Sequence, residues 1–254
     1  MLEQLGKRVL AFVEAMGGMV LLVFYFFQDL FTGRIHWRNT LQQMSRVGLE
    51  SMALVLVASA FVGAVFTVQV IGEFARLGAL RLLGGIVGLA LWRELAPVFT
   101  ALVVAGRAGA AISAELGTMK VTEQIDALRA MAINPHQHLV APRIGAGVVM
   151  LPLLTGLADV TGFFSGLAIA VFVGKINPNS YFNSAQNMLH PIDIWGGLCK
   201  ALLFGCIITA VACYNGLNAS AGAEGVGQVT TRTVVTSFVL IFILNYIMSV
   251  FIYS

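Results

Sequence analysis

Long uninterrupted runs of apolar residues constrain this chain more than any other feature. They lie at about residues 47–72, 82–108, 144–174, 194–215 and 231–253. Each run reaches the roughly 20 residues that an α-helix needs to cross the hydrocarbon core of a bilayer. The apolar residues are continuous rather than alternating, which favours helices over the strands of a transmembrane barrel. Because lipid offers the backbone no hydrogen bonds, the runs predict about five membrane-spanning helices.

Composition supports the same fold class. The chain is 58% hydrophobic and only 11% charged, whereas soluble domains carry about 25% charged residues. We therefore expect an all-α integral membrane protein without a soluble domain. Residues 41–254 form its membrane domain, and residues 1–40 form a separate N-terminal region.

The N-terminal region contains a shorter apolar stretch. Its cleanest part, Ala15 to Phe27, has about 13 residues, fewer than the roughly 20 that a span needs. Gly17 and Gly18 interrupt it, and polar residues follow it. We predict an amphipathic helix lying in the membrane interface, and a sixth span is the alternative.

Lys and Arg residues predict the orientation, because cytoplasmic loops carry an excess of them. If the N-terminus is cytoplasmic, that side holds ten: Lys7, Arg8, Arg34, Arg38, Arg46, Arg107, Lys120, Arg129, Arg143 and Arg232. The opposite side holds four: Arg76, Arg81, Lys175 and Lys200. We therefore expect a cytoplasmic N-terminus and a C-terminus on the outer side.

A polar segment at residues 115–135 separates the second and third apolar runs. It carries five charged residues: Glu115, Lys120, Glu123, Asp126 and Arg129. We predict a cytoplasmic helix at about 118–134, capped by Thr122 and ended by Asn134 and Pro135. Acids in its first turns and Arg129 near its end suit the helix dipole.

One face of this predicted helix is apolar. Ile125, Leu128, Met131 and Ala132 share that face, while Glu123, Gln124 and Asp126 lie off it. A short amphipathic helix of this kind is suited to a groove on a partner protein. The alternative is a helix that lies flat on lipid headgroups.

Small residues recur every four positions just before this segment. They are Ala101, Ala105, Gly109, Ser113 and Gly117. Such a ridge lets two helices approach closely in lipid. It predicts tight packing for the cytoplasmic end of the second span, without identifying the neighbouring helix.

Four charged residues lie inside predicted spans: Arg93, Glu94, Asp159 and Lys200. Each costs roughly 2.5 to 3.5 kcal/mol at mid-membrane, so such residues face a cavity or pair with one another. We interpret them as a polar seat for a charged lipid headgroup. Three alternatives stay open: Arg93 and Glu94 neutralise each other, Lys200 snorkels to the outer headgroups, and Asp159 accepts hydrogen bonds from neighbouring helices.

An apolar stripe runs along the outer half of the first span. Phe66, Val70, Phe74 and Leu77 fall roughly on one helical face. Next to Arg93 and Glu94, this stripe would suit acyl chains beneath a headgroup. Plain helix packing is the alternative.

Signatures of catalysis are missing from the sequence. A P-loop ends in Gly-Lys-Ser or Gly-Lys-Thr, but the four lysines here precede Arg8, Val121, Ile176 and Ala201. The glycines at 222–227 do not have dinucleotide-binding spacing, and we interpret them as a cytoplasmic loop. The four histidines have no metal-ligand spacing, and no catalytic triad or carboxylate dyad stands out. We expect neither an enzyme nor a metal protein.

The central part of the chain resembles the MlaE-type permease subunits of ABC lipid transporters, which are related to the chloroplast lipid-import permease. The similarity covers nearly all of the chain from about residue 40. It rests on these segments: Trp92-Arg-Glu-Leu-Ala-Pro-Val98, Ala105-Gly-Arg-Ala-Gly109, Ala114-Glu-Leu-Gly-Thr-Met-Lys-Val-Thr-Glu-Gln-Ile-Asp-Ala-Leu128, Asn134-Pro135, Pro142-Arg143, Leu151-Pro-Leu-Leu-Thr155, Gly222-Ala-Glu-Gly-Val-Gly227 and Thr230-Thr231.

This resemblance implies a homodimeric permease in the bacterial inner membrane. It implies two ABC ATPase partners that bind ATP and magnesium, an MCE-domain protein on the periplasmic side and a phospholipid substrate, with no nucleic acid and no cofactor in this chain. The implied pocket residues are Phe66, Val70, Phe74, Leu77, Arg93, Glu94 and Lys200. The implied ATPase-coupling residues are Thr122, Glu123, Gln124, Ile125, Asp126, Leu128, Arg129 and Met131. Glu73 stands where an apolar pocket wall is expected.

Two other functions remain open from the residues alone. A proton-coupled secondary transporter would use Glu94 and Asp159. A membrane anchor that does not transport would use neither Arg93 nor Glu94. An energy source in a partner ATPase would distinguish the permease from both.

Overall fold

A computed structural model describes the backbone of residues 2–32 and 37–253, and the side chains of these residues except 2–9, 11 and 12. Arg34 and the side chains of Lys7 and Arg8, which contribute to the predicted orientation, lie outside the described part. Every regular element within it is a helix, which confirms the all-α fold class. Six helical stretches there are long and apolar enough to cross a membrane.

The helices follow one another with short connections. The first half contains α1 (Leu2–Phe31), α2 (Trp37–Met44), η1 (Ser45–Leu49), α3 (Glu50–Arg76), η2 (Leu80–Leu82), α4 (Leu83–Ala90), η3 (Leu91–Leu95), α5 (Ala96–Val104), η4 (Ala105–Gly109) and α6 (Ala110–Val121). The second half contains α7 (Gln124–Ala130), η5 (His136–Val140), α8 (Ala141–Phe172), α9 (Pro178–Met188), α10 (Pro191–Leu217) and α11 (Gly222–Tyr253).

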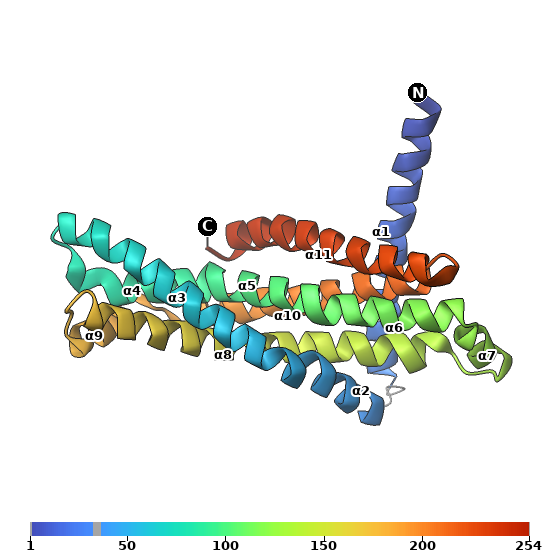
Figure 1. Cartoon of the computed structure of the whole chain (residues 1–254), viewed down its shortest axis with the longest axis horizontal. Helices are drawn as coiled ribbons and strands as arrows, with labels where there is room; N and C mark the ends of the chain where they lie inside the picture. Colours follow the sequence, from blue (N-terminus) through green and yellow to red (C-terminus); the bar gives the residue numbers. More distant parts are fainter. Residues whose placement is uncertain (1, 33–36, 254) are drawn as a thin grey trace.

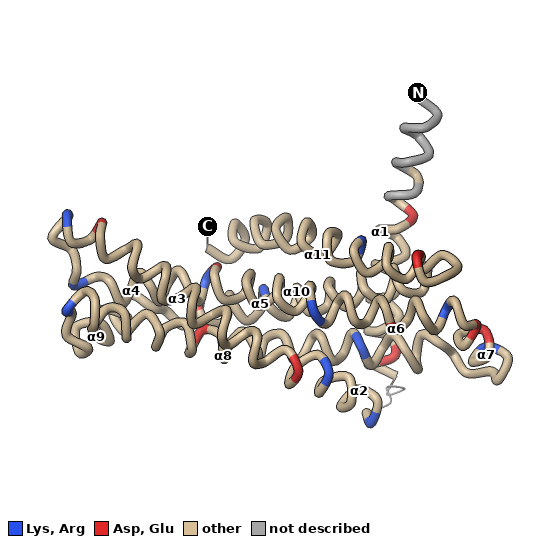
Figure 2. The backbone as a smooth tube through the Cα atoms, in the orientation of Figure 1, with Lys and Arg blue, Asp and Glu red and all other residues tan. Residues whose placement is uncertain are grey.

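The long helices form one elongated bundle. Figure 1 shows α3, α5, α6, α8, α10 and α11 running along the long axis, with α7 at one end and α9 at the other. Charged residues gather toward the two ends, and a smaller group lies partway along the bundle (Figure 2). This distribution fits a bundle whose long axis crosses a membrane.

Helix α1 runs in a different direction from the rest. Figure 1 shows it standing across the bundle near the α7 end, where it contacts α8, α10 and η5. The helix continues without a break through Gly17 and Gly18, and Val13–Phe31 is long and apolar enough to span. Length therefore does not distinguish the two interpretations, and the interfacial helix stays a prediction that the crossing direction favours.

Close backbone contacts hold the bundle together. A Cβ atom at Gly63 of α3 would overlap the backbone of Gly162 of α8, so these two helices meet at a distance that only glycine permits. The predicted ridge of small residues is also buried. Gly109 faces Ile208 of α10, and Gly117 faces Val229 of α11. The tight packing is confirmed, and its neighbours are α10 and α11.

Three local predictions are wrong. The second span continues as α6 to Val121, so the polar segment is divided between the end of this helix and α7. Residues 222–227 are the first turns of α11 rather than a loop. The polar stretch before α10 contains helix α9, which sequence reasoning missed. Asn177 caps that helix by accepting a hydrogen bond from the Asn179 amide at 2.9 Å, and Pro178 suits its first position.

Candidate functional site

The intramembrane charges meet where span two contains a π-helical turn, η3. This turn carries Arg93 and Glu94 about 15 Å along the helix from Leu83, at 1.5 Å per residue. Arg93 Nε donates to Asp193 Oδ1 of α10 at 2.7 Å, and Lys200 Nζ of α10 lies 2.8 Å from Glu94 Oε1. The two neighbours in sequence therefore pair with two different residues of α10, and not with each other. We call these four residues the outer charge cluster.

Pro97 and Gly197 explain why α10 approaches η3 so closely. Proline has no N–H, so Pro97 cannot donate to a carbonyl of the preceding turn. Lys200 Nζ instead donates to the Arg93 carbonyl at 2.8 Å. A side chain at Gly197 would overlap the Trp92 carbonyl. Pro97 therefore leaves the Arg93 carbonyl free to accept from Lys200. Gly197 lets α10, which carries Lys200, come close enough to make this bond.

Asp193 has two partners at the start of α10. Its Oδ1 accepts from Arg93, and its Oδ2 accepts from the His190 backbone amide at 2.8 Å. The side chain thus caps its own helix while it neutralises Arg93. The sequence shows it only as an acid near a predicted helix start, and we did not single it out.

Helix α11 completes the outer charge cluster. Asn245 Nδ2 donates to Glu94 Oε2 at 2.7 Å, and Ser249 Oγ lies 2.7 Å from both Glu94 Oε1 and Lys200 Nζ. The Tyr253 ring lies 4.6 Å from Arg93 Cζ, within cation–π range. Sequence reasoning missed these three residues, although polar side chains one turn apart in an apolar span were an available signal.

Exposure separates the four charged residues into two kinds. The side chains of Asp193 and Lys200 are completely buried, while those of Arg93 and Glu94 are 36% and 39% exposed. Lys200 therefore does not snorkel to the headgroups, and it does not line an open surface as the expected pocket required. Arg93 and Glu94 are the members of the outer charge cluster that remain accessible to a ligand.

The apolar stripe is only partly placed beside these charges. Phe66 and Val70 pack against a buried apolar cluster that contains Leu91 of η3, and Trp92 and Leu95 pack against the same cluster. Arg93 and Glu94 turn instead toward α10 and α11. Phe74 is half-buried, and Leu77 is 75% exposed just after α3 ends.

Glu73, which interrupts the expected apolar wall, forms an exposed ion pair with Arg76 at 3.4 Å. Its charge is thus neutralised on the helix surface. Within one chain, the structure does not bring the whole stripe and the charges into one pocket.

The predicted cytoplasmic helix is shorter than expected. Thr122 does not cap it, because its hydroxyl donates back to the Thr118 carbonyl of α6 at 2.8 Å. Glu123 takes the cap position with φ 60° and no side-chain hydrogen bond. Helix α7 ends at Ala130, where the amide of Ile133 donates to the Leu128 carbonyl at 3.0 Å. This bond and the left-handed Ala132 (φ 57°) form a Schellman ending, so Asn134 and Pro135 do not stop the helix.

The apolar face of α7 points inward. Ile125 is buried and Leu128 packs on the main core, so these side chains seat α7 on the helical bundle itself. The interpretation that they fill a partner's groove is wrong. Exposed residues of the predicted coupling set are Thr122, Glu123, Gln124, Asp126, Arg129 and Met131.

A second ion-pair cluster fixes the α7 end of the bundle. Glu115 of α6 pairs with Arg46 of η1 at 3.0 Å and with Arg143 of α8 at 2.9 Å. Nearby, Arg107 of η4 pairs with Glu50 of α3 at 2.6 Å. These pairs connect the three spans that begin or end beside α7. From the sequence these arginines indicate orientation and family resemblance, but not these ion pairs.

Asp159 forms no ion pair with either cluster in the described part of the chain. It lies in the middle of α8, 3% exposed, and its Oδ1 has no hydrogen-bond partner among the described residues. The alternative in which neighbouring helices saturate this carboxyl group is therefore not what the structure shows. No group of three or more His, Cys, Asp or Glu residues suited to a metal ion occurs in the described part.

Comparison with known proteins gives a consistent result. Residues 40–251 match the family model described as Permease MlaE. A probable ABC transporter permease protein of Synechocystis sp. is 49% identical over 223 residues, covering 88% of this chain and 85% of that protein. The chloroplastic protein TRIGALACTOSYLDIACYLGLYCEROL 1 of Arabidopsis thaliana is 45% identical, covering 87% of this chain and 63% of that protein. The intermembrane phospholipid transport system permease protein MlaE of Haemophilus influenzae is 35% identical, covering 98% and 95%.

Proposed function

Because the chain belongs to the MlaE family of permeases and is the membrane permease subunit of an ABC lipid transporter, we propose that it moves phospholipid through an outward-facing cavity while separate ATPase subunits supply the energy. Arg93 and Glu94 would hold the headgroup in that cavity. The chain is a multi-pass protein of the inner membrane, and we propose that its N-terminus is cytoplasmic and its C-terminus periplasmic.

One observation carries this proposal. Arg93 and Glu94 are each over a third exposed within a membrane-spanning helix, although their partners on α10 are completely buried. A charge open to acyl chains is costly, so this edge must face water, a polar ligand or another protein surface. A zwitterionic headgroup supplies an anionic phosphate that matches Arg93 and a cationic amine that matches Glu94. Phe66 and Val70, on the neighbouring apolar cluster, lie at the same end of the bundle as α9 and would border the acyl chains.

A second copy of the chain would close the cavity. Few residues of α3 and α11 are buried in the single chain, so both helices have apolar surface left for lipid or a partner. A homodimer would place two sets of Arg93 and Glu94 around one lipid. An MCE-domain protein on the periplasmic side would then receive or deliver the lipid there.

Two ATPases would act through α7. This helix is seated on the permease by Ile125 and leaves the acids Glu123 and Asp126 exposed. One unbroken helical rod, Leu80–Val121, joins α7 to Glu94, about 40 Å away at 1.5 Å per residue. Its two π-helical turns, η3 and η4, are places where hydrogen-bond register can change. Such a change is the two-state element that coupling requires.

The two other functions have less support. Glu94 is held by Lys200, Asn245 and Ser249, so its charge is compensated rather than free to carry protons. Asp159 is not part of that cluster. Membership of an ABC permease family also supports an energy source in a partner ATPase rather than a proton gradient or an anchor that does not transport.

Lipid retention tests the cavity. The permease would be purified with its partners, and co-purified phospholipid measured by mass spectrometry. We expect Arg93→Gln and Glu94→Gln to lower bound phospholipid, with Arg76→Gln, on an exposed surface pair, unchanged. Equal phospholipid in all four proteins would refute the cavity proposal. Glu123→Lys should reduce ATPase co-purification without breaking a contact of the permease, because Glu123 has no side-chain partner among the described residues. Intact binding would refute docking at α7.

A further inference from the structure

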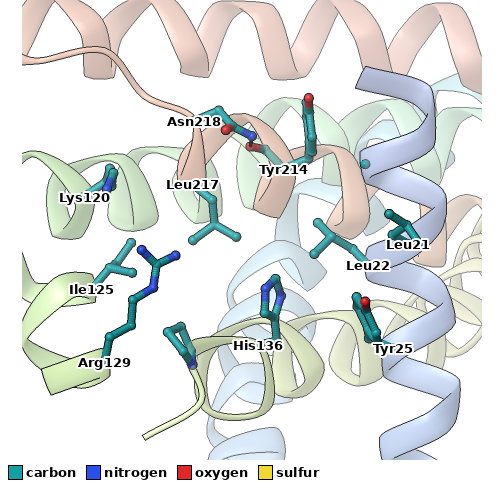
Figure 3. Close-up of a pocket in the computed structure, with 12 residues that line it drawn as sticks. Leu21, Leu22, Tyr25, Lys120, Ile125, Arg129, His136, Tyr214, Leu217 and Asn218 are labelled. Atoms are coloured by element: carbon teal, nitrogen blue, oxygen red, sulfur yellow. Dashed lines mark hydrogen bonds between the residues drawn. The ribbon is translucent and has the colours of Figure 1, made fainter. Parts of the chain in front are cut away.

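A cavity of about 330 Å³ lies at the α7 end, between α1, α7 and the end of α10. Its volume falls within the range of small-ligand sites. It is far from the outer charge cluster, so the proposed transport cavity does not account for it. Figure 3 shows residues of α1, α6, α7, η5 and α10 converging on it, which means that its shape depends on how α7 sits on the bundle.

The cavity wall changes from apolar to cationic across its width. Leu21 and Leu22 of α1 and Leu217 of α10 form the apolar side, and Lys120 and Arg129 lie on the α6 and α7 side. Figure 3 shows the Arg129 guanidinium extending into the space that Leu217 and His136 border. A ligand with an anionic end and an apolar end matches this gradient.

The charges leave capacity for an anion. Asp126 is shared, accepting from Lys120 at 3.3 Å and from Arg129 at 3.1 Å. Both cations keep further N–H donors, since Lys has three and Arg has five. The next carboxylate, Asp29, accepts from Gln137 at 2.9 Å and lines an adjoining cavity instead.

A buried atom on the wall also lacks a partner. His136 Nδ1 has no hydrogen bond within the part of the chain that the structure describes. Buried polar atoms in native proteins are nearly always hydrogen-bonded. The His136 ring borders the cavity, so a ligand seated there would lie against this side chain.

We propose that this cavity binds the phosphate of an anionic phospholipid from the cytoplasmic leaflet. Arg129 and Lys120 contact the phosphate oxygens, for which the planar guanidinium offers paired donors. Leu21 and Leu22 contact the glycerol and the first acyl methylenes. If α7 couples to an ATPase, as the proposed function holds, the bound lipid fixes α7 against α1 and α10.

The same lipid position is consistent with the surroundings of α1. A fully apolar groove of about 530 Å³ lies on another face of this helix, lined by Val20, Phe24 and residues of α10 and α11. Helix α1 therefore separates a mixed cavity from an acyl-compatible groove. A helix with a mixed cavity on one side and an apolar groove on the other suits the membrane interface, where phospholipid phosphates lie.

The test measures lipid bound to the intact transporter. The permease with its ATPase is placed in nanodiscs of phosphatidylcholine, with or without phosphatidylglycerol, and bound lipid is counted by native mass spectrometry. Arg129→Gln and Lys120→Gln should each lower phosphatidylglycerol affinity about fivefold. Leu21→Trp fills the cavity without changing charge and should also abolish retention. Arg38→Gln and Val13→Trp are matched controls for charge and bulk outside the cavity.

A soluble source of phosphate is distinguished in a second arm. Inorganic phosphate is added to phosphatidylcholine nanodiscs, and thermal unfolding is followed. Stabilisation that Arg129→Gln removes, without phosphatidylglycerol retention, would overturn the lipid source in favour of free phosphate. Equal retention by the wild type, Arg129→Gln and Leu21→Trp would overturn the site. The ATPase is visible in the same spectra, so its absence would count against the proposed function and not against this cavity.

Discussion

Lys200 Nζ lies 2.8 Å from Glu94 Oε1, and the lysine is completely buried while the glutamate is 39% exposed. The pair therefore joins an inner, structural charge to an outer, accessible one. Lys200 holds Glu94 and the Arg93 carbonyl, so in the proposed cavity it would position these groups rather than contact a ligand itself. This division of roles makes different predictions for the two residues.

Replacing Lys200 by methionine should destabilise the protein by about 2 kcal/mol. A broken buried ion pair costs more than this, but Glu94 is partly solvated. Thermal unfolding of Lys200→Met, Glu94→Gln and the double variant forms a double-mutant cycle. We expect the double variant to be more stable than Lys200→Met, because no unpaired charge remains. Additive losses would contradict the pairing.

The ion pairs at the α7 end of the bundle give a second stability prediction. Glu115→Gln leaves Arg143, 3% exposed, without its counter-charge and should cost about 2 kcal/mol. Glu73→Gln breaks the exposed pair with Arg76 and should stay within about 0.5 kcal/mol. Unfolding of the two variants under the same conditions compares them directly. A Glu115→Gln protein as stable as Glu73→Gln would show that the cluster contributes no stability.

Helix α7 should loosen when its buried anchor is shortened. Ile125→Ala removes a side chain that is 1% exposed, and large-to-small changes at such positions cost about 2 kcal/mol or more. Hydrogen exchange of residues 122–133 should rise and ATP turnover should fall. Met131→Ala changes a 62% exposed side chain and serves as the control for exchange. Unchanged exchange in Ile125→Ala would contradict the inward seating of α7.

Helix contact at Gly63 can be tested within a single helix. Gly63→Ala should force α3 away from the Gly162 backbone and lower the thermal midpoint. Gly72→Ala, in the same helix, meets nothing within 4 Å and should leave stability unchanged or slightly raise it. If both variants unfold alike, the close approach of α3 and α8 is not important for stability.

The sequence predicted the helices well because apolar length and small-residue spacing are local signals. The ridge from Ala101 to Gly117 is buried as expected, whereas its neighbours α10 and α11 could be identified only from the fold. Helix α9 was missed because its polar composition resembles a loop, and its helical state depends on Asn177 capping and on Tyr181 packing. Residues 222–227 were predicted to be a loop because closely spaced glycines usually mark turns. In the structure they form the first turns of α11, which the local sequence does not indicate.

The site was predicted only in part. Arg93 and Glu94 were identifiable because charges in an apolar span are costly. Lys200 was identifiable in the same way, but its pairing with Glu94 was not, and Asp193 and Asn245 were missed, because only the fold brings these distant residues together. Thr122 failed as a cap for a related reason: the preceding helix α6 continues to Val121, so the Thr122 hydroxyl bonds to α6 instead.

The central claim is that this permease moves lipid only when a separate ATPase drives it. The direct measurement places the purified permease in vesicles with a fluorescent phospholipid, with and without its ATPase and ATP, and follows the transfer of the lipid. We predict transfer that requires both the ATPase and ATP hydrolysis and is lost in Glu94→Gln. Equal transfer by the permease alone would contradict the account.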